Sequence, residues 1–213
     1  MRASRLLAAY IPERLPVRLM LPVSAALALA ASGGRWDRPD ALAMAFATAW
    51  LLVAQFRTWD DLADLPRDRV AHPHRVLVTA ASTGPVRRLC IAHAVVNTGW
   101  IAARDGFGLT LVLFAALNGA LAAWYARRGP RTAGSDHLLL AKYPAIVAIV
   151  AGDRAVAHPG RALLAMATVY LAACVYEAWH DRTSPANGSR LLVASEAVLL
   201  VIMLAALSIG GRS

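Results

Sequence analysis

Long blocks of apolar residues alternate with short polar segments along this chain. Seven of the blocks approach the roughly 20 residues that an α-helix needs to cross a bilayer. They are predicted at residues 17–33, 41–56, 89–103, 107–126, 138–151, 161–179 and 191–209. The connections are short and leave no room for a separate soluble domain. The pattern therefore predicts an all-α protein, with residues 1–213 forming one polytopic transmembrane bundle of about seven spans.

The N-terminal segment has a different pattern. Its sequence, MRASRLLAAYIPERL, intersperses arginines with leucine, alanine, tyrosine and isoleucine. This pattern is typical of an amphipathic helix lying on a membrane surface. The following apolar run ends in small residues, as a signal peptide does, but the long basic segment before it argues against cleavage. We therefore expect residues 1–15 to form a surface helix.

Composition and charge narrow the class of protein. The chain is 58% hydrophobic and has a formal net charge of +9. Its basic residues lie in loops between apolar blocks rather than on one contiguous face, which argues against nucleic-acid binding. Most of them fall in the N-terminal segment and in every second loop, and the positive-inside rule assigns these to the cytoplasm. We expect a multi-pass protein of the cytoplasmic membrane with its N-terminus inside.

The two cysteines give no sign of a disulfide or a zinc site. Cys90 and Cys174 both fall in predicted spans and lack metal-ligand spacing. We expect them to be packing residues.

An acidic segment, DDLADLPRD, directly follows the second apolar block. An unbroken helix would bring its four aspartates, Asp60, Asp61, Asp64 and Asp68, to one face. Pro66 interrupts that geometry, because proline cannot donate in a helix interior and disfavours the helical conformation of the residue before it. Crowded carboxylates repel one another unless a cation neutralises them. Mg²⁺ fits best, because it prefers oxygen ligands and often joins carboxylates to a substrate phosphate.

A second acidic pair follows the sixth block. Glu177 and Asp181 stand four residues apart and so share a helical face. The predicted topology puts this pair on the same membrane side as the first acidic segment. Two acidic motifs facing each other, with basic residues between them, suit a diphosphate held through two Mg²⁺ ions.

These paired motifs resemble those of the UbiA superfamily of intramembrane prenyltransferases. DDLADLPRD is similar to the family's first aspartate-rich motif, with Asp60 in place of an asparagine, and EAWHD to the second, with Glu177 in place of an aspartate. The segments RVAHPHRVL and LAKYPAI also resemble family segments. The family usually has nine spans, so a seven-span chain has a lateral wall that is open, rebuilt or supplied by another subunit in a homo-oligomer.

The resemblance implies an enzyme that ionises an isoprenyl diphosphate and transfers the prenyl group to an aromatic or lipid acceptor, whose identity the sequence leaves open. The expected Mg²⁺ ligands are Asp60, Asp61, Asp64, Asp68, Glu177 and Asp181, and the expected catalytic residues are Asp61, Asp64, Lys142 and Asp181. The expected substrate-binding residues are Arg67, Arg69, Arg75, Arg182, Tyr176 and Trp59. Positive charge would stabilise the leaving diphosphate, and aromatic faces would stabilise the allylic cation.

Two alternatives stay open. DDLAD also reads as the motif of terpene synthases, so a terpene cyclase on the same scaffold would release diphosphate without an acceptor. A non-catalytic homologue would act as a membrane partner or lipid-binding subunit.

Five further residues have competing interpretations. Lys142, the one lysine, is either a phosphate contact or a side chain reaching the interface. Arg57 is either a salt-bridge partner of Asp61 or a substrate contact. Glu196 lies inside the last apolar block, where it is either a functional residue or a buried residue with a structural hydrogen bond. Asn97 and Asn118 are either interhelical hydrogen-bond residues or catalysts, and we expect the hydrogen bonds.

Overall fold

The computed structural model describes residues 3–33, 38–127, 129, 132–180 and 190–210. Within these residues the chain is helical and has no β-strand. The helices are α1 (Ala3–Arg14), α2 (Val17–Ser32), α3 (Pro39–Ala63), α4 (Leu65–Ala71), α5 (Val76–Thr79), α6 (Gly84–Asp105), α7 (Leu109–Ala126), α8 (Ala133–Leu140), α9 (Lys142–Ala151), α10 (Asp153–Ala157), α11 (Pro159–His180) and α12 (Arg190–Gly210).

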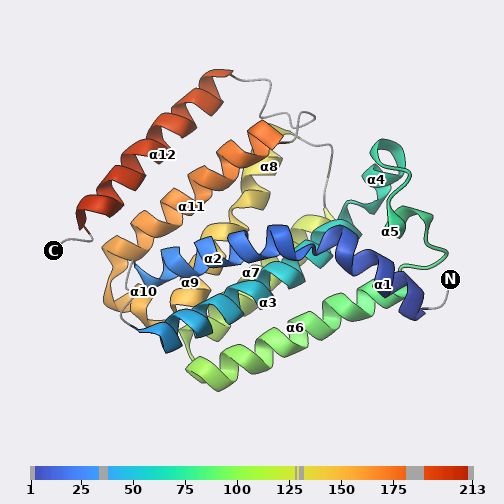
Figure 1. Ribbon diagram of the computed structural model, residues 1–213, viewed down its shortest axis with the longest axis horizontal. Coiled ribbons are helices and arrows are strands. Elements are labelled where there is room, and N and C mark those ends of the chain that lie inside the picture. Colours follow the sequence, from blue (N-terminus) through green and yellow to red (C-terminus); the bar gives the residue numbers. More distant parts are fainter. Residues whose placement is uncertain (1–2, 34–37, 128, 130–131, 181–189, 211–213) are drawn as a thin grey trace.

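The long helices form a bundle around α3. This helix packs against α2, α6 and α9, and α11 packs against α9 and α12 (Figure 1). Leu52 and Phe56 of α3 are almost fully buried, as are Ile146 and Ile149 of α9. The short helices α1, α4 and α5 gather at one end of the bundle, and α10 lies at the other (Figure 1).

Amide side chains connect the helices inside this core. Gln55 of α3 donates to the Asn118 Oδ1 atom of α7 at 2.6 Å, and Asn97 of α6 donates to the Gln55 Oε1 atom at 2.7 Å. The interhelical roles predicted for Asn97 and Asn118 are therefore confirmed. Such bonds matter in an apolar bundle, because a buried amide without a partner is costly.

In the part of the chain that the structure describes, three helices are long and apolar enough to span a membrane: α3, α7 and α11. A fourth span is possible if α1 and α2, which are bent by 59° at their junction, are counted as one. All seven predicted segments are helical in the structure, but the count of seven spans is not confirmed. α2 has 16 residues and α9 has 10, and α6 is long but less apolar. Exposed apolar side chains on α6, α7 and α12, such as Ile91, Val112 and Ile202, are consistent with a membrane protein.

The predicted fifth helix, residues 138–151, is divided into α8 and α9. Pro144 explains the division, because it has no N–H to donate to the carbonyl of Leu140 one turn earlier. α8 also begins earlier than expected, at Ala133, where Thr132 and Ser135 form a reciprocal capping box. The break places Lys142 at the first residue of α9, at a helix junction rather than inside a continuous helix.

Candidate functional site at the acidic end of α3

The acidic segment lies at the junction of α3 and α4. α3 continues to Ala63, past the predicted end at residue 56, so Asp60 and Asp61 are on its last turn. Asp64 lies between the two helices, as the C-cap of α3 and the N-cap of α4. Pro66 lies in the first turn of α4, where a missing N–H costs no helical hydrogen bond. The helix break separates Asp68 from the α3 acids. The single face that an unbroken helix would give is therefore not formed.

Asp60 is paired with groups from two other helices. Its Oδ1 accepts from the hydroxyl of Tyr125 at the end of α7, and its Oδ2 accepts from the ammonium of Lys142. Lys142 is 5% exposed and Asp60 is 9% exposed. This ion pair joins residues 82 positions apart and ties the ends of α3, α7 and α9 together.

Asp61 is paired with the N-terminal helix. Arg14 donates from Nε to Asp61 Oδ2 at 3.0 Å and from Nη2 to Oδ1, while the Tyr10 hydroxyl donates to Oδ2 at 2.8 Å. Burial and the neighbouring Asp61 carboxylate raise the pKa of the Tyr10 phenol, so the phenol remains a donor. α1 is therefore held against the acidic end of α3 by its own polar residues.

Other cations surround the same acids. Arg57 Nε lies 3.8 Å from Asp61 Oδ1, and this nitrogen is buried with no hydrogen-bond partner in the described part of the chain. Arg75 Nη1 is 2.5 Å from Asp68 Oδ2, and Arg67 Nη1 is 3.9 Å from Asp64 Oδ1. Acids and bases thus meet at one end of the bundle, with their charges largely compensated by one another.

Aromatic rings border this charged group. The rings of Trp59 and Tyr125 are tilted against each other with centroids 5.6 Å apart, and Tyr125 also donates to Asp60. The Lys142 ammonium lies 5.5 Å from the centroid of the Tyr143 ring. An apolar substrate whose charged end met Asp60 and Lys142 would therefore have aromatic faces beside it.

The remaining predicted residues are more scattered. Arg69 is exposed on α4. Tyr176 is 54% exposed and stacks on His180 at 5.1 Å, and Glu177 is half-buried beside it on α11. Asp181 and Arg182 lie outside the described residues. The second acidic motif is thus described only at Glu177, near the C-terminal end of α11, which packs beside α8.

The acids suit Mg²⁺ by their chemistry. Carboxylate oxygens are its preferred protein ligands. A carboxylate offers about four lone-pair positions, and the hydrogen bonds of Asp60 and Asp61 leave some of them open. These aspartates do not converge, however. Among the described residues, the ligand atoms that come together in a group of three belong to His137, Cys174 and Glu196. Holding one Mg²⁺ at several of the aspartates would therefore require their side chains to rearrange.

Two participants in this site and one residue of the bundle core were missed by sequence reasoning. Tyr10 and Arg14 contact Asp61 from the segment expected to be only a surface helix, and Gln55 connects α3 to α6 and α7. The signal for Arg14 was weak: an arginine in an amphipathic segment is normally read as a lipid headgroup contact. Gln55 had a clearer signal, as an amide within an apolar block.

Comparison of the chain with protein-family models, with curated proteins and with solved structures finds no match.

Proposed function

We propose that this protein is an integral membrane prenyltransferase that ionises an isoprenyl diphosphate at the acidic end of α3 and transfers the prenyl group to an aromatic or lipid acceptor. One observation carries the proposal. Four aspartates meet Arg14, Arg57, Arg67, Arg75 and Lys142 at one end of an apolar helical bundle. A ligand with a multiply charged head and a long apolar tail matches both parts of this arrangement.

The charges also suggest how the site changes on binding. Without a ligand, the cations neutralise the aspartates. A diphosphate would compete for these cations, because arginine binds phosphate in bidentate fashion and lysine binds it as a point charge. Arg57 is the best placed to respond, since its Nε already lacks a hydrogen-bond partner among the described residues. As the cations turn to phosphate, the aspartates would lose their neutralising charges.

Mg²⁺ would then be the counter-ion of the aspartates. We propose Asp60, Asp61, Asp64 and Asp68 as its first group of ligands, with Glu177 and Asp181 as the second. When bound, the metal would neutralise the diphosphate and favour its departure. The chain's own residues would do the rest: arginines and Lys142 bind phosphate oxygens, and the apolar helices exclude water from the prenyl group.

The aromatic pair would protect the reactive carbon. Trp59 and Tyr125 lie beside Asp60, where a positive charge would develop once diphosphate departs. A cation over an aromatic face is stabilised by about 0.5 to 2 kcal/mol. Tyr176, exposed on α11, would contact the substrate from the side of the second motif.

The proposed topology follows the charge distribution. Seven helices, α2, α3, α6, α7, α8 with α9, α11 and α12, would cross the membrane, and α1 would lie on its cytoplasmic surface over Asp61. The acidic end of α3 would face the cytoplasm. An isoprenyl diphosphate, whose charged head is soluble in water, would reach the site from there. The arginines near this end agree with the positive-inside rule.

The proposal is tested by incubating the purified protein in lipid nanodiscs with geranyl, farnesyl and geranylgeranyl diphosphate, with and without Mg²⁺. Diphosphate release that requires both Mg²⁺ and an added aromatic or lipid acceptor is the expected result. Release without any acceptor, together with a cyclic hydrocarbon, would instead identify a terpene cyclase. Absence of release with every donor and acceptor would contradict the enzymatic proposal.

A non-catalytic membrane partner is the second candidate, and one observation favours it. Asp60, Asp61 and Asp68 each already have a cation from this chain, so the acidic segment is stable without any ligand. A protein of this kind would use the ion pairs only to hold α1, α3 and α9 together. It would bind lipid and release no diphosphate under the conditions above.

A further inference from the structure

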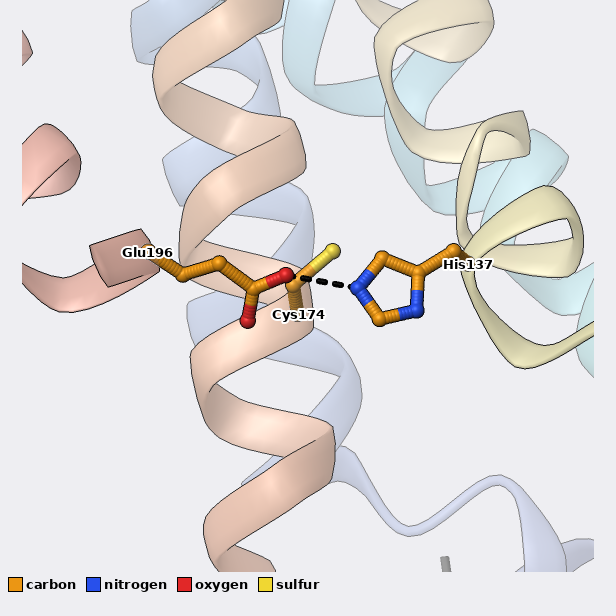
Figure 2. Close-up of side chains that lie close together, drawn as sticks. All are labelled: His137, Cys174 and Glu196. Carbon is orange, nitrogen blue, oxygen red and sulfur yellow. Dashed lines mark hydrogen bonds and ion pairs between the residues drawn. The ribbon is translucent and has the colours of Figure 1, made fainter. Parts of the chain in front are cut away.

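A second cluster of chemically active side chains lies away from the acidic segment. His137 of α8, Cys174 of α11 and Glu196 of α12 converge between their helices (Figure 2). His137 Nε2 is 2.6 Å from Glu196 Oε1, and the ligand atoms of all three residues lie within 4.8 Å of one another. Cys174 is free and 2% exposed, and Glu196 is 6% exposed.

The backbone determines which nitrogen of His137 faces the cluster as an acceptor. Nδ1 is 2.8 Å from the carbonyl oxygen of Ala133. A carbonyl oxygen only accepts, so Nδ1 must carry a proton, and in a neutral imidazole Nε2 then has a lone pair. Metal-bound histidines are commonly oriented by such a second hydrogen bond. The Tyr170 hydroxyl, 3.4 Å from the His137 carbonyl oxygen, further supports this part of α8.

In this arrangement two hydrogen-bond acceptors, His137 Nε2 and Glu196 Oε1, face each other. The Nε2 lone pair of neutral His137 points at a carboxylate oxygen 2.6 Å away, and such a contact is repulsive unless a proton or a metal ion lies between them. The other carboxylate oxygen, Glu196 Oε2, is buried and has no hydrogen-bond partner in the described part of the chain. A buried carboxylate oxygen without a partner is costly, so the cluster calls for an additional positive charge.

We propose that His137, Cys174 and Glu196 bind one Zn²⁺ ion. Imidazole, thiolate and carboxylate are its usual ligands, at about 2.0 to 2.3 Å, and sites with three protein ligands keep a fourth position for water. Tetrahedral bonds of that length separate ligand atoms by roughly 3 to 4 Å. Zinc binding would widen the 2.6 Å contact between His137 and Glu196 and bring all three ligand atoms, which now lie within 4.8 Å of one another, to this spacing.

The competing structure is an ion pair between protonated His137 and Glu196. It would supply the missing proton and leave Cys174 as a buried packing residue, but Glu196 Oε2 would still have no hydrogen-bond partner in the described part of the chain. Zinc accounts for all three side chains. It would also fasten α12, which packs against α11, to α8, five residues before Lys142. The site is independent of the proposed prenyl transfer and could exist in a non-catalytic protein.

The test measures metal content. The full-length protein is purified in detergent, stripped with a chelator and titrated with Zn²⁺, and bound zinc is determined by mass spectrometry. The expected result is one tightly held zinc per chain in the wild type and in the controls Cys90→Ser and His93→Ala. Cys174→Ala, His137→Ala and Glu196→Gln should each lower the affinity by 10-fold or more.

Cobalt substitution identifies the thiolate directly. Co²⁺ should produce a sulfur-to-cobalt charge-transfer band in the wild type and in Cys90→Ser but not in Cys174→Ala. Circular dichroism checks that each variant is folded; Cys174→Ala should be, since alanine fits the space of a small buried thiol. Absence of zinc binding by the wild type would overturn the proposal. Equal binding by Cys174→Ala and wild type would also overturn it.

Discussion

Lys142 donates a hydrogen bond to Asp60 Oδ2 across the junction between α9 and α3. Both side chains are buried, and Tyr125 holds the other oxygen of the same carboxylate. The ion pair therefore couples the helix that carries the acidic segment to the helix that begins just after α8. Breaking it should affect stability as well as any activity at this site.

The first prediction concerns this pair. Lys142→Met should destabilise the protein by about 3 to 5 kcal/mol, because Asp60 would be left buried and charged without a cation. Asp60→Asn should have a similar effect by stranding Lys142. The double variant Asp60→Asn with Lys142→Met should recover most of the loss, since no uncompensated charge remains. Thermal unfolding in detergent measures the stability of all three variants. Equal stability of Lys142→Met and wild type would show that the ion pair contributes little to stability.

The second prediction concerns α1. Arg14→Ala should cost about 3 to 5 kcal/mol, since it removes the guanidinium from buried Asp61. Arg14→Lys should recover only part of this, because lysine cannot form the two parallel hydrogen bonds. Arg18→Ala, at an exposed position of α2, is the matched control and should have almost no effect. Hydrogen exchange would report faster exchange of the α1 amides in Arg14→Ala alone, and unchanged exchange would show that α1 is held by other contacts.

The third prediction concerns the amide network. Gln55→Leu and Asn97→Leu should be non-additive, because the two side chains bond to each other. Double-mutant cycles on such bonds in a membrane protein average about 0.6 kcal/mol and reach about 1.7 kcal/mol. A coupling energy in this range is expected from unfolding measurements. The control is Thr98→Ala, at an exposed position next to Asn97, which should show no coupling energy with Gln55→Leu. A coupling energy as large as that of Asn97→Leu would contradict the predicted interaction between Gln55 and Asn97.

The fourth prediction concerns membrane topology. In a Cys90→Ser background, His74→Cys should face the cytoplasm and Phe107→Cys the outer side. Both positions are exposed in the structure, and the remaining Cys174 is buried. A membrane-impermeant maleimide applied to intact cells should label Phe107→Cys and not His74→Cys, with both labelled after lysis. The reverse pattern would place the acidic segment outside the cytoplasm.

The apolar blocks predicted the helices well, because burial in an apolar bundle requires backbone hydrogen bonds to be satisfied within each helix. Local breaks were harder to predict. The division at residue 141 is explained by Pro144, which has no N–H to donate to the carbonyl of Leu140 one turn earlier. The continuation of α3 to Ala63 brings Asp60 and Asp61 to cations from other helices. The periodicity of apolar residues along the sequence does not reveal such distant partners.

The candidate site shows the same limit more clearly. The sequence indicated that Asp60, Asp61, Asp64 and Asp68 need a neutralising cation, for which we expected Mg²⁺; the structure shows arginine and lysine side chains beside them. The sequence could not indicate that Arg14 and Lys142 are among these side chains, since these partners are 47 and 82 residues away. The cluster of His137 and Glu196, 59 residues apart, was likewise invisible because it has no spacing signature.

Asp64→Asn gives the most direct test of the proposed ionisation chemistry. Asp64 is only half-buried, so its neutralisation should leave the fold intact, unlike changes at Asp60 or Asp61. Diphosphate release from the preferred donor, with its acceptor and Mg²⁺ present, should fall by about 100-fold or more relative to wild type. The control Asp40→Asn, at an exposed position on the first turn of α3, should retain full release. Equal release by Asp64→Asn and wild type would contradict the account.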